Sequence, residues 1–173
     1  MPTVKEAAPQ PERIQRASSR VILINDDGRV LLFEGGAEQM GQDRPNWWLP
    51  GGGTEPGEDA RTSAARELHE ETGLFIDPAA LTGPVAFSRG PWRFLDRHYW
   101  SVDTFFMLRV PSWEISRAGW SASEHEIMNQ HRWWSATELR ATSDIFFPVD
   151  LPSLLERLYA GDIPDVPLEV PWR

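Results

Sequence analysis

The stretch that decides the fold runs from Gly51 to Leu74 and reads GGGTEPGEDARTSAARELHEETGL. It predicts a helix, because Asp59 is a good N-cap residue and Gly73 is a typical residue at a helix C-terminus. Alanines and a leucine recur along one flank of this helix, which is therefore expected to pack against a sheet. The three glycines that precede the helix allow the backbone to approach a ligand closely.

Three glutamates, Glu67, Glu70 and Glu71, share one face of the predicted helix because they are three or four residues apart. Like charges at this spacing repel each other unless something neutralises them. Mg²⁺ is a candidate, since it binds carboxylate oxygens and keeps positions for water and substrate phosphates. The alternative is an acidic face that is exposed only to water, and the three glutamates alone do not decide between the two.

The composition is that of one globular domain with a core of its own: 173 residues, 40% hydrophobic and 25% charged. The 17 Lys and Arg against 26 Asp and Glu give a net charge of −9, which argues against a nucleic-acid partner. The absence of cysteine excludes disulfides, thiolate catalysis and zinc–thiolate sites. The chain has neither an apolar run of membrane-spanning length nor a signal-peptide core at its N-terminus, so we expect a cytoplasmic protein without a membrane partner.

We expect a flexible N-terminal arm at residues 1–17, a domain at residues 18–160 and an extended C-terminal tail at residues 161–173. Within the domain, alternating and apolar runs predict strands at residues 20–24, 29–33, 74–76, 85–87, 99–110 and 132–134. Further helices are predicted from residue 135 onward and at residues 152–159, and loops at residues 35–46 and 88–100. Residues 122–129 are expected to form either a short helix or an ordered acidic loop.

Taken as a pattern, the stretch resembles the Nudix box. It has Gly52, five residues, Glu58, seven residues and then the run RELHEETGL that ends at Leu74, so every defining position is filled. The preceding WLPGG, residues 48–52, is similar to the lead-in that the family uses. The resemblance covers residues 18–160 and implies an α/β fold, the Nudix fold, which is an α/β/α sandwich with a mixed β-sheet and a loop–helix–loop that carries the box.

The resemblance also implies an enzyme, a pyrophosphohydrolase that cleaves the diphosphate linkage of a nucleoside diphosphate joined to a group X. A phosphoanhydride is densely anionic, so its hydrolysis needs both charge neutralisation and an activated water, and Mg²⁺ or Mn²⁺ supplies both. The implied partner is a small-molecule nucleotide. A homodimer is compatible with the resemblance, since many members of the family are dimers.

Carried over residue by residue, the box assigns most of the metal ligands. The resemblance makes Glu70 and Glu71 the main ligands, and Glu67 either a further ligand or the general base. It also makes the carbonyl oxygen of Gly51 a ligand that completes the site. These four residues are the expected metal site.

Other charged residues are expected to support the box. Arg66 should orient the carboxylates through an ion pair with Glu67 or Glu58, and Glu58 should act as support rather than as a ligand. Many family members use a glutamate outside the box as an extra base or ligand, and Glu124 and Glu126 are the candidates for that role.

Substrate contacts are expected from the region that follows the box. Arginines there are candidates for phosphate binding, and tryptophans are candidates for stacking on a base. The candidates are Arg89, Arg93 and Arg97 for phosphate, and Trp92, Trp100 and Trp47 for stacking.

The substrate itself is left open by the sequence. The signatures of members that cleave NADH, ADP-ribose, dinucleoside polyphosphates or coenzyme A are not matched, which leaves a nucleoside triphosphate, oxidised or not, or a nucleotide sugar. Two other functional interpretations are alternatives to a hydrolase. One is a non-catalytic Nudix-fold nucleotide sensor, and the other is an isopentenyl diphosphate isomerase, which generally uses a cysteine that this chain lacks.

Overall fold

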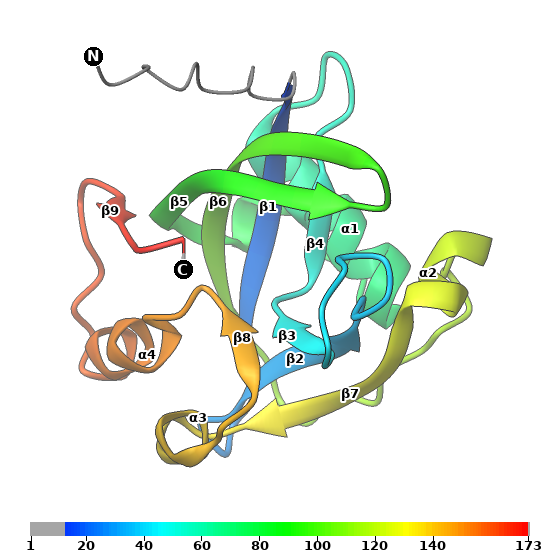
Figure 1. The fold of residues 1–173 in the computed structure, drawn as a ribbon. Coiled ribbons are helices and arrows are strands. Elements are labelled where there is room, and N and C mark those ends of the chain that lie inside the picture. The colour runs from blue at the N-terminus through cyan, green and yellow to red at the C-terminus, as the bar shows by residue number, and fades with distance from the viewer. Residues whose placement is uncertain (1–12, 173) are drawn as a thin grey trace, which may run out of the picture.

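The computed structural model describes residues 13–172, and these residues form a mixed sheet with helices on both faces (Figure 1). The strands are β1 (Ile14–Ile24), β2 (Val30–Gly35), β3 (Asn46–Trp48), β4 (Gly51–Gly53), β5 (Thr82–Phe94), β6 (Arg97–Arg109), β7 (Met128–Trp134), β8 (Ile145–Phe147) and β9 (Leu168–Glu169). The helices are α1 (Ala60–Thr72), the 3₁₀ turn η1 (Pro78–Ala80), α2 (Ala122–Ile127), α3 (Ala136–Ala141) and α4 (Leu151–Tyr159).

The strand β1 lies at the centre of the sheet, whose order is β8-β3-β2-β1-β6-β5-β9. It pairs in parallel with β6 along its whole length, from Ile14 opposite Tyr99 to Ile24 opposite Arg109. It also pairs antiparallel with β4, whose Gly51 lies opposite Arg20. The glycines that lead into the predicted box are therefore held by the central strand, and residues 54–59 connect them to α1.

Side chains of β1 alternate between two hydrophobic cores. Ile22 and Ile24 belong to the core that contains the leucines of α4, whereas Val21 and Leu23 belong to the core that contains Ala64, Ala65 and Leu68 of α1. Both faces of β1 are thus buried from Val21 to Ile24, which is typical of a central strand with helices on each side. This layering is the predicted α/β/α sandwich.

The predicted helices are present in the structure. The Asp59 carboxylate caps α1 by accepting hydrogen bonds from the backbone N–H groups of Arg61 and Thr62, and α1 ends at Gly73 with a left-handed φ of 75°. Both predictions for the ends of this helix are confirmed. The helices α3 and α4 also lie where they were expected, residues 122–127 form the helix α2 rather than a loop, and α3 has the predicted capping box at Ser135.

Two predictions for the segments that follow the box helix were wrong. Residues 74–76 form no strand, because Leu74 packs into a core while Phe75 is 80% exposed, and the segment has no strand partner. Residues 88–100 are not a loop: they belong to the β5–β6 hairpin, in which Ser88 pairs with Asp103 and Phe94 with Arg97. The mixture of arginines and aromatic residues in this segment suggests a loop, but the residues alternate between a buried and a solvent-exposed face, as in a strand.

Segments near both ends of the described part of the chain take part in the sheet. Residues 14–17, which were expected in the arm, form the start of β1, while residues 1–12 lie outside the described residues. In the tail, Leu168 and Glu169 form β9, which pairs in parallel with Ala86 and Phe87 of β5. Among residues 13–172, no helix has the length and apolar character needed to cross a membrane.

The core that contains α4 supplies a stability prediction with a matched control. Leu155 of α4 is fully buried, so Leu155→Ala should lower the free energy of unfolding by about 2–5 kcal/mol, measured by urea denaturation. Leu95→Ala removes the same atoms from a side chain that is 57% exposed, and it should change the free energy of unfolding by less than about 0.5 kcal/mol. Equal losses for the two variants would contradict this assignment of the core.

Candidate active site

The acidic residues of the box lie on a helix that is fixed by its apolar flank. Ala64, Ala65 and Leu68 of α1 are buried against the sheet, and this fixes the direction of the neighbouring glutamates. Glu71 is only 4% exposed and Glu67 is also largely buried. Burial raises the pKa of Glu67, and it raises the pKa of Glu71 well above the usual value, because both carboxylates are withdrawn from water.

Arg66 is the centre of a network of carboxylates. Its Nε and Nη2 each donate a 3.0 Å hydrogen bond to the carboxylate of Glu58, one to each oxygen. Its Nη1 lies 3.0 Å from Glu67 Oε1 and 3.0 Å from Glu70 Oε2, and its Nη2 also donates to the carbonyl of Gly53. The hydrogen bonds from Arg66 lower the pKa of Glu58. Both ion pairs expected for Arg66 are therefore present.

The glycines of β4 allow the close contact between this strand and α1. The backbone N–H of Gly51 donates a 2.7 Å hydrogen bond to Glu71 Oε2, and Gly51 has a φ of 136°. A Cβ atom at position 51 would lie 2.2 Å from the Ser19 carbonyl oxygen, and one at position 52 would lie 2.6 Å from the Glu67 carboxylate. Only glycine fits at both positions without a shift of the backbone or of the glutamate.

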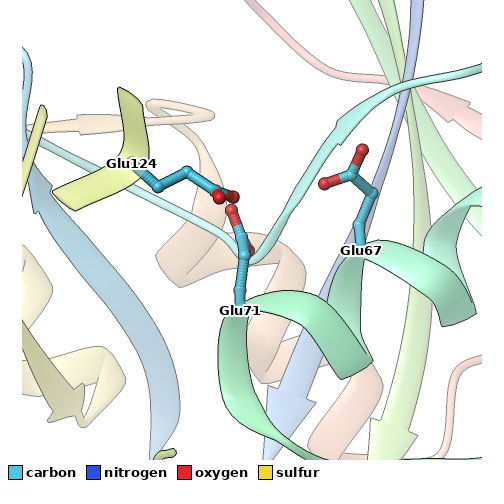
Figure 2. Close-up of side chains that lie close together, drawn as sticks. All are labelled: Glu67, Glu71 and Glu124. Atoms are coloured by element: carbon cyan, nitrogen blue, oxygen red, sulfur yellow. The ribbon is translucent and has the colours of Figure 1, made fainter. Parts of the chain in front are cut away.

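Three carboxylates from two helices meet beside these glycines. Glu67 and Glu71 of α1 and Glu124 of α2 each place one oxygen within 4.8 Å of the others (Figure 2). Figure 2 shows the carboxylates of Glu71 and Glu124 directed toward each other across the gap between the helices. Glu124 is held by Ser121, whose backbone N–H and hydroxyl donate to its carboxylate at 2.5 and 2.6 Å. Close oxygen donors of this kind suit a hard divalent cation such as Mg²⁺.

The other two predicted acidic residues lie apart from this cluster. Glu70 borders the same cavity, but its carboxylate pairs with Arg66. Glu126 is exposed and is not part of the cluster. Of the two candidates outside the box, only Glu124 is brought to the box glutamates.

The cluster lies in a cavity of about 480 Å³, large enough for a small organic ligand. One part of its lining is polar and contains the box glycines, the glutamates and several serines, while the remainder is mostly aromatic and aliphatic. The large apolar lining residues are Met40, Trp48, Trp92, Phe94, Phe105, Ile127, Met128, Phe147, Pro148 and Trp172. A ligand with a charged part and an apolar, planar part would match this division.

Two arginines and an aspartate of the cavity were missed by the sequence analysis. Arg20 forms a 2.6 Å ion pair with Asp103 and donates to the carbonyls of Leu49 and Gly51. The Arg16 guanidinium lies over the ring of Trp92, with its Cζ atom 5.4 Å from the ring centroid. The sequence does contain a pattern that indicates the two arginines: polar residues alternate at positions 16, 18 and 20, just before an apolar strand.

Arg16 differs from Arg20 in its partners. Within residues 13–172 the structure gives the Arg16 guanidinium no carboxylate ion pair, although the group is partly withdrawn from water. Burial lowers the pKa of Arg16, with a further contribution from the positive charge of Arg20. Arg16 is therefore a cation at the cavity wall that forms no ion pair within residues 13–172.

The predicted substrate-binding residues of the hairpin divide between its two faces. Trp92 lines the cavity, whereas Arg89 and Arg93 alternate with it and are exposed on the opposite face. Arg97 is exposed on β6 and does not line the cavity either. Arg89 pairs instead with Glu169 of the tail at 2.8 Å.

The model of the NUDIX domain family matches residues 14–151, from the start of β1 to the start of α4. An "RNA pyrophosphohydrolase" of Roseobacter denitrificans is 30% identical over 145 residues, which cover 75% of this chain and 84% of the relative. A "Putative 8-oxo-dGTP diphosphatase" of Bacillus subtilis is 37% identical over 79 residues, which cover 46% of each chain.

Solved structures share the fold. The MutT protein from Methanosarcina mazei Go1 aligns with a TM-score of 0.61 at 19% identity, over 88% of this chain and 99% of that chain. A NUDIX hydrolase from Nitrosomonas europaea aligns with a TM-score of 0.59 at 23% identity, over 87% of this chain and 92% of that one. The sheet and the loop–helix–loop described above are therefore an architecture that other proteins also have.

The buried Glu71 carboxylate predicts a pH effect on stability. Its folded-state pKa is raised, so above about pH 4.5 the folded state binds a proton that the unfolded state has released. Stability of the metal-free protein should therefore fall as pH rises above this value. Glu71→Gln keeps an acceptor for the Gly51 N–H and removes the charge. In chelator at pH 7.5 it should raise Tm by about 3 °C, which corresponds to about 1 kcal/mol for a chain of this size.

The measurement is thermal unfolding at several pH values, with Mg²⁺ and with EDTA. Wild type should gain stability from Mg²⁺, and the gain should be larger at pH 8 than at pH 5, because the ion compensates the charge that burial disfavours. Glu71→Gln should lose most of that gain. A variant that is less stable than wild type in EDTA at every pH would show that Glu71 contributes stability as an anion.

Proposed function

Because this chain belongs to the NUDIX domain family and is a hydrolase of phosphoanhydride bonds, we propose that it is a Mg²⁺-dependent pyrophosphohydrolase of a nucleoside diphosphate derivative. The observation that carries the proposal is the group of Glu67, Glu71 and Glu124 at one side of a cavity of about 480 Å³. An acidic cluster suited to a metal ion and a ligand-sized apolar space occur together, and hydrolysis of a nucleotide needs both.

The donor set fits the proposed metal. Carboxylate oxygens are the ligands that Mg²⁺ and Mn²⁺ prefer, and three of them converge here from two helices. We propose Glu67, Glu71 and Glu124 as residues that hold the ion, while Glu70 and the carbonyl of Gly51 remain ligands predicted from the box. When bound, a divalent ion supplies neutralisation of phosphate charge and a more acidic water.

The protein's own residues position these groups. Arg66 holds the carboxylates of Glu67 and Glu70 in fixed directions, and the N–H of Gly51 holds that of Glu71. Either Glu67 or Glu124 would accept the proton of the attacking water, since both carboxylates face the cavity. The apolar lining limits the number of waters that compete for the reacting phosphorus.

Arg16 is the cation that we propose for substrate phosphate. An anionic substrate entering this acidic cavity needs positive charge besides the metal, and Arg20 is already paired with Asp103. Arg16 has no such partner in the described chain and lines the same cavity. A guanidinium can donate two parallel hydrogen bonds to a phosphate, which makes it suitable for this contact.

For the substrate we propose a nucleoside triphosphate, normal or oxidised, cleaved to a nucleoside monophosphate and pyrophosphate. The relative named as a putative 8-oxo-dGTP diphosphatase supports this class. The relative named as an RNA pyrophosphohydrolase makes an RNA 5′ end the competing substrate, but the net charge of −9 disfavours an RNA backbone. A nucleotide sugar, a cytoplasmic location and a homodimer stay predictions from the sequence.

The test is a hydrolysis panel with Mg²⁺ that contains normal and 8-oxo nucleoside triphosphates, nucleotide sugars and a 5′-triphosphorylated oligoribonucleotide. Wild type should release pyrophosphate from a triphosphate, and EDTA should abolish the activity. Glu124→Gln should lower kcat about 100-fold or more, as expected for loss of a base or a metal ligand. Glu126→Gln, two residues away but outside the cluster, is the matched control and should retain wild-type kcat.

Several results would count against parts of this proposal. If pyrophosphate is released only from the oligoribonucleotide, the substrate is an RNA 5′ end and not a free nucleotide. Equal kcat for Glu124→Gln and wild type would remove Glu124 from the metal site. No hydrolysis of any panel member with Mg²⁺ or Mn²⁺ would leave the proposed activity without support.

A further inference from the structure

The C-terminal tail returns to the cavity and is held there at several points. Its strand β9 pairs with β5, and the next residue, Val170, is buried in the core and donates from its N–H to the Phe87 carbonyl at 2.9 Å. On the outer face of the hairpin, Glu169 accepts hydrogen bonds from Arg89 at 2.8 and 3.2 Å. The tail is thus attached by backbone pairing, burial and an ion pair just before it reaches Trp172.

The ring of Trp172 lies on β5 at Gly90, a residue that has no side chain. A Cβ atom at Gly90 would lie 2.4 Å from Cγ of the Trp172 ring, so the indole rests directly on the backbone of this glycine. Gly90 and Trp92 are two residues apart on one strand and therefore face the same side, which is the side of the cavity. Trp172 consequently lines the cavity next to Trp92, although the two are far apart in sequence.

Both indoles have used their only hydrogen-bond donor inside the protein. Nε1 of Trp172 donates to the Pro91 carbonyl at 3.1 Å, and Nε1 of Trp92 donates to the Ser101 hydroxyl at 2.6 Å. Trp92 is also stacked on Tyr99, with the ring centroids 4.7 Å apart. Since an indole has no other polar group, these two side chains can contribute only ring surface to a ligand.

We propose that Trp172 is a specificity-determining residue, supplied by the C-terminal tail, that binds the nucleobase of the substrate by stacking beside Trp92. This inference rests on the proposed function, since a nucleotide is the ligand that has a planar apolar group joined to phosphates. The glutamates provide the polar part of the cavity, the Arg16 guanidinium lies over the Trp92 ring, and Trp172 provides surface for the base. Stacking without free donors accepts any base but rejects a phosphate compound that has none.

The experiment measures the Kd of wild type and of Trp172→Ala by calorimetry with Mg²⁺ and two probes. The first probe is an α,β-methylene analogue of ATP or GTP, which carries a base, and the second is inorganic triphosphate, which does not. Stacking on an aromatic residue contributes about 1–3 kcal/mol per base, so Trp172→Ala should weaken binding of the analogues about 5- to 100-fold. Its Kd for inorganic triphosphate should equal that of wild type.

Two control variants separate stacking from a structural effect. Trp172→Phe keeps a ring and should retain most of the affinity for the analogues. Val166→Ala changes a residue of the same tail that is 74% exposed and outside the cavity, and it should bind both probes as wild type does. Thermal unfolding of each variant shows whether the tail remains folded.

The inference is overturned if Trp172→Ala binds the analogues as tightly as wild type, if it loses equal affinity for both probes, or if wild type binds no analogue. Its failure can be distinguished from that of the proposed function. A wild-type protein that binds the analogues through Trp172 but hydrolyses none of the natural nucleotides would retain the base site and lose the proposed activity.

Discussion

The guanidinium of Arg66 donates hydrogen bonds to three glutamates and to a backbone carbonyl, and the architecture of the box depends on this one group. Without it, the carboxylates of Glu58, Glu67 and Glu70 would be held close together with no compensating charge, an arrangement that is strongly destabilising when partly buried. Its bond to Gly53 joins α1 to β4, which in turn pairs with the central strand. Arg66 forms no ion pair with Glu71 or Glu124 among the described residues, and these two carboxylates lie close to each other and to Glu67.

Local signals were sufficient to predict the box helix and most of the helices around the sheet. The Asp59 cap, the C-terminal Gly73 and the capping box at Ser135 each depend on contacts within a few residues, which a sequence displays directly. The contacts of Arg66 with Glu58 and Glu67 were implied by the resemblance to the Nudix box, and all three residues lie on or just before this one helix. These parts of the fold and site could be derived because they need no knowledge of how the strands pair.

The remaining cavity residues depend on pairing between distant segments. Arg16 and Asp103 come to the same cavity because β1 and β6 run in parallel in one register, which neither segment specifies alone. Glu124 could not be preferred over Glu126 before the position of α2 was known. Arg89 and Arg93 are predicted to bind phosphate only if their segment is a loop. In the β5–β6 hairpin, alternation assigns both side chains to the outer face.

The position of Gly90 has a consequence for how such a cavity can change in evolution. The ring that covers this glycine belongs to a different part of the chain from the strand that carries it. A substitution at position 172 can therefore replace one wall of the cavity while the backbone pairing between the strands stays unchanged. A side chain acquired at position 90 would instead displace the tail and bring a new group into the same space. The wall of the cavity at position 172 can thus change in evolution while the sheet that supports it stays the same.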